Sequence, residues 1–152
     1  MKSSFVGSLA ISVFLLVAAV AKWLYPVHLA FRLDRIASII EIAIAITLPI
    51  VYRKAWAWAW ISSLFSLWLG YGVFWWIQNK NCGCFGQAFQ VSAGLTVVIN
   101  AIVIGMAFWN WGRIEKQAKK KQLFIVIDGL LLVTGFLTAT WINWMTEGVV
   151  VG

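Results

Sequence analysis

Residues 56–77 read WAWAWISSLFSLWLGYGVFWWI, and none of these 22 residues is charged. A run of roughly 20 mostly apolar residues is long enough to cross a lipid bilayer as a helix. Inside a bilayer only helices and closed barrels satisfy every backbone polar group. This run is continuously apolar, whereas barrel strands alternate between apolar and polar positions. The segment therefore predicts a transmembrane helix.

Four further segments have the same character, at about 4–23, 35–52, 91–111 and 123–144. The whole chain of 152 residues is 62% hydrophobic and only 11% charged, and a soluble domain of this length could not hide so much apolar surface. We therefore predict an all-α membrane protein with a transmembrane four-helix bundle core and a fifth transmembrane helix. Residues 1–152 form a single multi-pass domain, in which a basic cytoplasmic loop at 112–122 precedes the fifth helix.

The basic residues predict the orientation. If the segments alternate in direction, eight of the 12 Lys and Arg residues fall on one side, and they are Lys2, Arg53, Lys54, Arg113, Lys116, Lys119, Lys120 and Lys121. Positively charged loops stay cytoplasmic, so we expect the amino terminus inside and the carboxyl terminus outside, in a bacterial inner membrane. The net charge of +7 then reflects topology and attraction to lipid headgroups. A basic run this short and this close to the membrane does not indicate nucleic-acid binding.

Tryptophans concentrate near the predicted ends of the segments, as in the aromatic belts of membrane proteins. Trp58 and Trp111 are among those expected at the headgroup level, and only Trp68 of the 11 lies centrally in its segment.

Both cysteines lie in one short loop, in the sequence Cys82-Gly83-Cys84-Phe85-Gly86. On the outer side of the membrane a disulfide is permitted, and Gly83 could adopt the unusual dihedral angles that a bridge between residues i and i+2 requires. Such a tight ring would be strained and readily exchanged. Lys80 and the start of the fourth segment would favour the thiolate, which is the reactive form.

Two other interpretations of the cysteine pair remain open. Cys82 and Cys84 could bind a soft metal ion such as Cu(I), with His28, the only histidine, as a third ligand on the same side. They could also be inert loop thiols or a permanent small disulfide.

A carboxyl group, Glu41, lies inside the second segment. Asp34, Ser38, Glu41 and Ala45 recur at helical spacing and share one helix face. Ionisable residues within membranes are costly and are functional candidates by default. Glu41 is either a paired residue that fixes helix packing or a proton partner for thiol chemistry. The other intramembrane carboxyl group, Asp128, is expected to reach the headgroups or to pair with Lys120 or Lys121.

The order of these features resembles the MauE (methylamine utilisation) branch of the DoxX-like membrane proteins. The matching pieces are Ala21-Lys22-Trp23, Glu41, Cys82-Gly83-Cys84-Phe85-Gly86, Val91-Ser92 and Asn100, over residues of about 5–111. The resemblance implies a small four-helix membrane core. It also implies a role in the redox maturation of exported proteins, commonly beside a thioredoxin-like partner.

Together these observations predict thiol–disulfide exchange at the outer membrane face, as by a thiol–disulfide oxidoreductase. Cys82, Cys84 and Glu41 would carry the chemistry, with Gly83, Phe85, Gly86, Lys80 and Asp34 in support, and no cofactor is expected. The alternatives are a metal-thiolate binding or transport module and a non-catalytic membrane partner of a thioredoxin-like protein.

Overall fold

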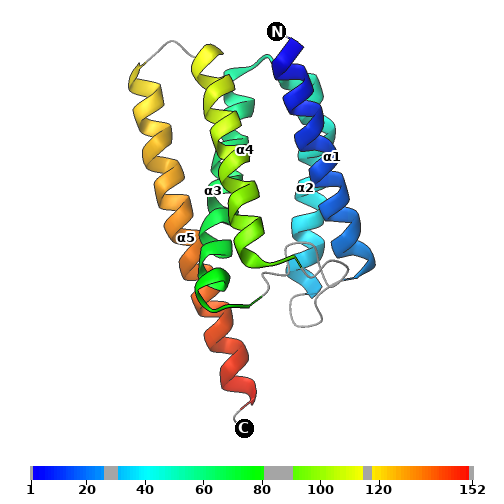
Figure 1. Ribbon diagram of the computed structural model, residues 1–152, viewed down its shortest axis with the longest axis vertical. Helices are drawn as coiled ribbons and strands as arrows, with labels where there is room; N and C mark the ends of the chain where they lie inside the picture. The colour runs from blue at the N-terminus through cyan, green and yellow to red at the C-terminus, as the bar shows by residue number, and fades with distance from the viewer. Residues whose placement is uncertain (1, 26–30, 81–90, 115–117, 151–152) are drawn as a thin grey trace.

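A computed structural model describes the backbone of residues 2–25, 31–80, 91–114 and 118–150, and the side chains of residues 4–25, 35–80, 91–114 and 122–144. The elements are five α-helices, α1 (Lys2–Leu24), α2 (Phe31–Val51), α3 (Ala55–Ile77), α4 (Ala93–Ile114) and α5 (Ala118–Val150). They run up and down beside one another, so that consecutive helices are antiparallel (Figure 1). The predicted all-α architecture is confirmed.

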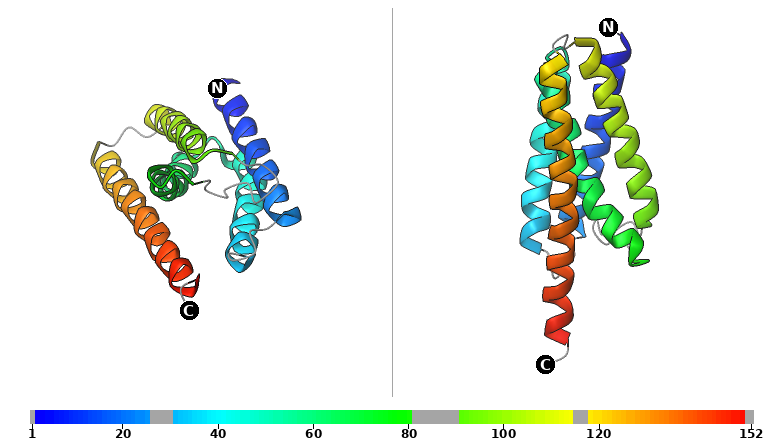
Figure 2. Two further views of the ribbon diagram at one scale, coloured as in Figure 1. Left: turned by 60° about the horizontal axis from the view of Figure 1, so that its bottom comes forward. Right: turned by 90° about the vertical axis from the view of Figure 1, so that its left-hand side faces the viewer.

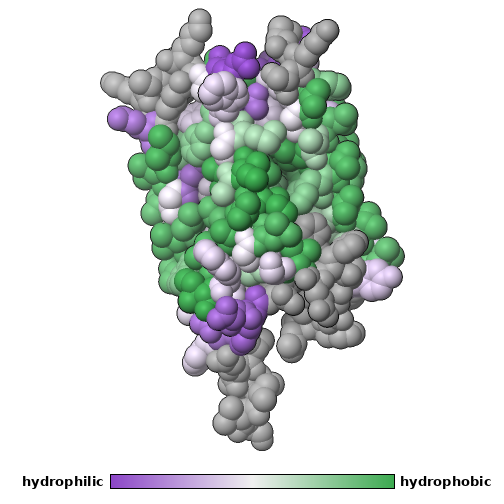
Figure 3. Space-filling model, in the orientation of Figure 1, coloured by the Kyte–Doolittle hydropathy of each residue, from purple (hydrophilic) through white to green (hydrophobic). Residues whose placement is uncertain are grey.

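Among the described residues, four stretches are long and apolar enough to cross a membrane, namely Ser4–Leu24, Ala55–Ile77, Ala93–Ile114 and Gln122–Trp144. The remaining helix, α2, has 21 residues and lies beside α1 (Figures 1 and 2). Its outward positions are exposed and apolar, and they include Ile36, Ile39, Ile40, Ile46 and Ile50. On the face shown in Figure 3, a broad apolar band lies between two more polar ends. The chain is a multi-pass membrane protein.

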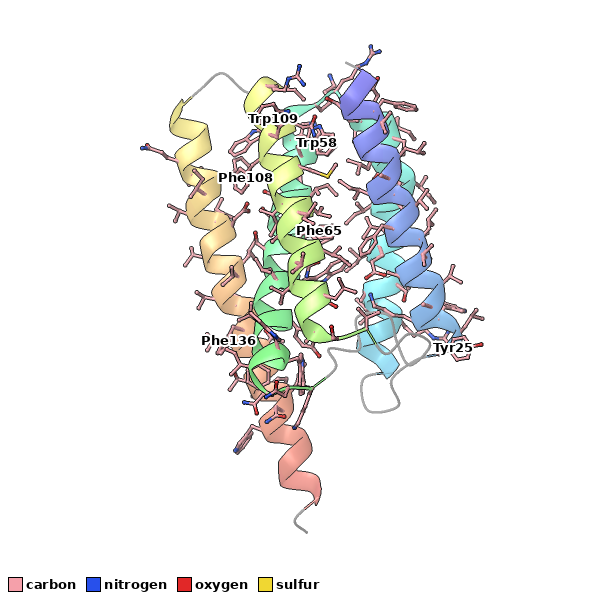
Figure 4. The ribbon with its side chains drawn as sticks, viewed as in Figure 1. Tyr25, Trp58, Phe65, Phe108, Trp109 and Phe136 are labelled. Atoms are coloured by element: carbon pink, nitrogen blue, oxygen red, sulfur yellow. The ribbon has the colours of Figure 1, made fainter. Side chains whose placement is uncertain are left out.

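The core lies where the α1–α2 pair meets α3 and α4. Its fully buried members include Leu15 of α1, Leu48 of α2 and both Trp58 and Phe65 of α3. Ala107 and Trp111 complete it from α4. Trp58 and Phe65 lie between the helices in Figure 4.

Two tryptophans expected in the headgroup belt belong instead to this core. Trp58 is completely buried, and its indole N–H donates a hydrogen bond to the carbonyl oxygen of Tyr52 at 2.7 Å. Its neighbours Trp56 and Trp60 are exposed. Residues four apart share a helix face and a residue two apart from both lies on the opposite face, so the three tryptophans cannot all face the lipid. Trp111 is buried for the same reason, while Trp109 faces outward.

Helix α3 is the centre of the bundle, because α4 and α5 both pack against it along their length. The α3–α5 contact is unusually close at two glycines. A Cβ atom on Gly70 would lie 1.8 Å from the carbonyl oxygen of Leu132, and one on Gly135 would lie 1.9 Å from that of Leu67. Small residues let transmembrane helices approach until their backbones touch. The fifth helix is therefore packed into the bundle.

The basic segment at 112–122 is not a loop throughout, which corrects the sequence-based prediction. Helix α4 continues to Ile114 and α5 already begins at Ala118, so that Lys119, Lys120 and Lys121 belong to α5. Ala, Lys and Gln are good helix formers, and a helix can extend beyond the apolar span that defines its membrane segment. Helix α5 also extends past residue 144, to Val150.

The two ends of the bundle carry different residues, as the alternation of segments predicts. Arg53 and Lys54 lie in the α2–α3 turn, and Arg113 lies in the last turn of α4 at the same end. Lys22, at the end of α1, and Lys80, just after α3, lie at the opposite end.

Candidate functional site

A buried ion pair joins α1 to α2. The Lys22 ammonium donates a hydrogen bond to Oε1 of Glu41, and the side chains are 8% and 0% exposed. The two residues meet because α1 and α2 are antiparallel neighbours, which brings the last turn of α1 beside the middle of α2. An ion pair removed from water is stable only with good geometry, since both charges lose their hydration. The pair is the most strongly polar contact in the described interior of the bundle.

Trp68 of α3 forms a third side of this site. The Lys22 ammonium lies 5.2 Å from the centroid of the Trp68 ring. The ring of Trp68 in turn packs edge-on against the ring of the buried Phe65, with 5.2 Å between the ring centroids. A cation over an indole face is stabilised by the ring quadrupole, and more so where water is absent. The centrally placed tryptophan of the sequence therefore contacts the buried lysine.

The predicted face of α2 is confirmed where side chains are described. Ser38 and Glu41 are both fully buried, and Ala45 is 3% exposed. The fourth member, Asp34, is in α2, but its side chain lies outside the described residues. Next to this face, the Arg35 guanidinium lies 4.1 Å from the ring of Trp23. Consecutive residues of α1, Lys22 and Trp23, thus each contact a charged residue of α2.

The cysteine motif, Cys82, Gly83, Cys84, Phe85 and Gly86, lies outside the described residues, and so does His28. The residues on either side of the motif are described. Lys80 follows α3, where its ammonium lies 3.4 Å from Oδ1 of Asn143 and 5.8 Å from the Trp75 ring. Val91 precedes α4 and packs against the small cluster formed by Ala18 and Ala21 of α1. The first described residue after the cysteine motif therefore lies near the last two turns of α1.

Two other pieces of the motif pattern lie among the described residues of α4 and the residue before it. Ser92 lies at the start of α4, where its hydroxyl accepts a hydrogen bond from the backbone N–H of Leu95 at 3.3 Å. Asn100 faces the interior from α4 and is only 2% exposed.

Asp128 does not behave as the sequence suggested. It is 5% exposed, and its two carboxyl oxygens accept hydrogen bonds from Ser62 and Ser63 of α3, each at 2.6 Å. The expected reach toward the headgroups is therefore wrong, because the docking of α5 on α3 offers serine partners inside the bundle. The expected pairing with Lys120 or Lys121 involves side chains that lie outside the described residues.

Sequence reasoning did not identify the partner of Glu41. Lys22 was named only within the Ala21-Lys22-Trp23 piece of the resemblance, although a basic residue directly after a long apolar run and a carboxyl group in the next segment suggest such a pair. Within the described part of the chain, no group of three or more His, Cys, Asp and Glu side chains could hold a metal ion. No protein-family model, curated protein or solved structure matches the chain.

Proposed function

We propose that this membrane protein exchanges thiols and disulfides at its outer face, through Cys82 and Cys84. The observation that carries the proposal is the position of the Lys22–Glu41 pair. It is buried in the half of the bundle from which the cysteine segment extends, and Val91, which follows that segment, packs against the cluster of Ala18 and Ala21 on the same part of α1. We further propose that the chain is a relative of the MauE and DoxX-like proteins, with a thioredoxin-like partner.

In the proposed exchange, two electrons pass between the partner's thiols and the Cys82–Cys84 disulfide. A thiolate of the partner attacks one sulfur of the Cys82–Cys84 disulfide, the bridge breaks, and a mixed disulfide forms. The second thiolate of the partner then resolves the mixed disulfide. The partner leaves oxidised by two electrons, and Cys82 and Cys84 remain as two thiols after taking up protons. The reverse sequence restores the bridge at the expense of a partner disulfide.

Two features of the ion pair support a role in this exchange. A cation near a sulfur favours the thiolate, and the Lys22 ammonium is a fixed cation in the half of the bundle from which the cysteine segment extends. Electrostatic interactions are also stronger in a dry interior than in water. Glu41 orients the ammonium, so it is best assigned as a positioning residue in place of the direct proton partner that the sequence suggested.

The distribution of basic residues gives the proposed orientation of the bundle in the membrane. The eight basic residues at the opposite end indicate the cytoplasm, so the cysteine segment and the carboxyl terminus would face the periplasm or cell exterior of a bacterial inner membrane.

The proposal is tested with the full chain in lipid nanodiscs and a reduced thioredoxin-like protein as the probe. Alkylation and mass spectrometry would follow the transfer of the disulfide over time. Cys82→Ser and Cys84→Ser should each abolish transfer, because a chain with a single cysteine of the pair cannot form the Cys82–Cys84 disulfide that the probe attacks. Glu41→Gln should slow transfer, and Glu41→Ala should slow it further.

Asp128→Asn is the matched control, since it changes the other buried carboxyl group without touching the Lys22 site, and transfer should keep its normal rate. Undiminished transfer in both cysteine variants would refute the proposal. Stoichiometric copper or zinc on the reduced protein, without transfer, would favour the metal-thiolate module.

A further inference from the structure

A short basic turn joins α2 to α3. It comprises residues 52–54 and lies at the same end of the bundle as the amino terminus (Figure 1), directly before the apolar span Ala55–Ile77. Its two basic residues, Arg53 and Lys54, are both exposed. Basic residues at the edge of an apolar span lie at the depth of the lipid headgroups. The turn therefore presents two cations where phosphate groups of the membrane are found.

Contacts of Tyr52 hold this turn in one conformation. Its carbonyl oxygen accepts a hydrogen bond from the indole N–H of the buried Trp58 at 2.7 Å. Its ring packs edge-on against Phe5 of α1, with 5.4 Å between the ring centroids. The turn is thus anchored both to α3 and to α1.

Tyr52 also positions the side chain of Arg53. Nε of Arg53 donates a hydrogen bond to the Tyr52 hydroxyl oxygen at 3.1 Å, and the guanidinium carbon lies 5.6 Å from the centroid of the Tyr52 ring. The two Nη atoms carry the other N–H donors of the guanidinium group, and their planar fork matches two oxygens of one phosphate. A side chain that is already positioned loses less conformational entropy when it binds a ligand.

The start of α3 adds further positive potential. Lys54 is the N-cap residue of α3, and its side chain makes no capping hydrogen bond. The first N–H groups of a helix have no acceptor within the helix, and they give its amino-terminal end a partial positive charge. Neither α3 nor α4 contains an acidic residue. The backbone of α3 therefore reinforces the attraction of Arg53 and Lys54 for an anion.

Two exposed tryptophans follow the turn on α3. Trp56 and Trp60 are 53% and 70% exposed, and they share one helix face because they are four residues apart. At 1.5 Å per residue, Trp60 lies about 6 Å deeper in the membrane than Trp56. An indole ring favours the boundary between headgroups and acyl chains, where its apolar body and its N–H are both satisfied. Cations at phosphate depth with indoles below them match an amphiphile better than a small soluble anion.

We propose that Arg53, Lys54, Trp56 and Trp60 form a binding site for an anionic phospholipid in the leaflet at the amino-terminal end of the bundle. The lipid phosphate lies against the two cations and the start of α3, and the glycerol and upper acyl groups lie along the two indoles. A zwitterionic lipid binds less well, because its own ammonium group repels the same cations. The site shares no residue with the proposed thiol–disulfide exchange.

Native mass spectrometry of the full chain tests this site, with limiting phosphatidylglycerol or phosphatidylcholine added to detergent micelles. The wild-type protein should retain phosphatidylglycerol in preference. Arg53→Gln and Lys54→Gln should each weaken its binding about five-fold, which corresponds to about 1 kcal/mol for one basic residue at a membrane surface. Lys80→Gln is the matched control, because it removes an exposed cation at the opposite end, and binding should be unchanged. Equal losses in all three variants would show general charge attraction and overturn the site.

The positioning of Arg53 and the contribution of Trp60 are tested in the same assay. Tyr52→Phe keeps the ring and every charge but removes the hydroxyl that holds Arg53, so we expect a smaller loss than in Arg53→Gln. Trp60→Ala should also weaken lipid binding, because it removes the deeper indole. Unchanged binding in both Tyr52→Phe and Trp60→Ala would contradict the proposed arrangement.

Thermal unfolding provides a second readout. Phosphatidylglycerol should raise the unfolding temperature of the wild-type protein, since a ligand that binds the folded state stabilises it. The double variant Arg53→Gln/Lys54→Gln should unfold near the wild-type temperature without added lipid and show a smaller rise with it. Inorganic phosphate at the same concentration should give no rise, because it does not reach the indoles. An equal rise with inorganic phosphate would replace the lipid site by a phosphate-ion site and refute the proposal.

Discussion

Gly70 and Gly135 occupy equivalent places on the two helices that they join. Each lies three residues after the leucine whose carbonyl oxygen meets the other glycine, Leu67 on α3 and Leu132 on α5. The two helices run in the same direction and touch through backbone atoms on both sides of the crossing. Contacts of the Cα–H to carbonyl type recur where helices approach so closely. The crossing fixes α5 at a single register, with Asp128 opposite Ser62 and Ser63.

A methyl group at this crossing should push the helices apart. Gly135→Ala places its Cβ atom against a backbone oxygen that cannot move aside alone, so we expect a loss of about 1–3 kcal/mol in stability, the usual cost of overpacking. Thermal unfolding in detergent micelles would measure it. Gly129→Ala is the matched control, because its Cβ atom meets open space on the same helix, and it should be neutral or stabilising by up to about 1 kcal/mol. Equal stability of the two variants would contradict the close backbone contact between α3 and α5 at Gly135.

The Lys22–Glu41 pair should show strong coupling. Lys22→Met leaves Glu41 buried without this cation, and breaking a buried pair from one side costs about 3–5 kcal/mol. Lys22→Met/Glu41→Met replaces both charges by apolar groups of similar size and should be more stable than Lys22→Met alone. A double-mutant cycle on unfolding free energies measures the coupling. Strictly additive effects would show that the two side chains act independently.

Trp58 should contribute more to stability than its neighbour Trp60. Trp58→Phe removes the N–H that Tyr52 accepts and leaves a small cavity in the core, so we expect a loss of about 1–3 kcal/mol. Trp60→Phe changes an exposed side chain and should stay within about 0.5 kcal/mol of the wild type. The comparison uses the same thermal unfolding assay, and a larger effect at Trp60 would argue against the burial of Trp58.

The orientation can be measured in intact cells. We propose that the positively charged loops hold the opposite end in the cytoplasm, so after mild reduction Cys82 and Cys84 should react with a maleimide that does not cross membranes. A cysteine introduced by Arg53→Cys, in an otherwise cysteine-free chain, should react only after the membrane is opened. The reverse labelling pattern would show that the cysteine segment faces the cytoplasm.

The sequence was sufficient for the features that depend on local pattern. The apolar runs place the helices, and helical spacing correctly predicts the buried face of Ser38, Glu41 and Ala45. It was insufficient where residues far apart in the chain meet. Lys22 and Glu41 are 19 residues apart, and their contact depends on how α1 crosses α2.

Asp128 illustrates the same limit at longer range. Lysines a few residues away suggested a partner, but Ser62 lies 66 residues away and becomes a neighbour only through the α3–α5 crossing. The tryptophans near the segment ends were assigned by position along the chain, whereas the side of the helix decides whether each faces lipid or core, as Trp58 shows.

The central place of α3 has a consequence for how the protein is made. Helices enter the membrane in the order of synthesis, so α3 must wait for α5 while α4 is translated. During that interval the serine-rich face of α3 and the backbone around Gly70 have no partner from α5. A chain that stops before α5 would carry this unfinished face permanently. Insertion of α5 is therefore the step that covers the polar face of α3 and closes the backbone contact around Gly70.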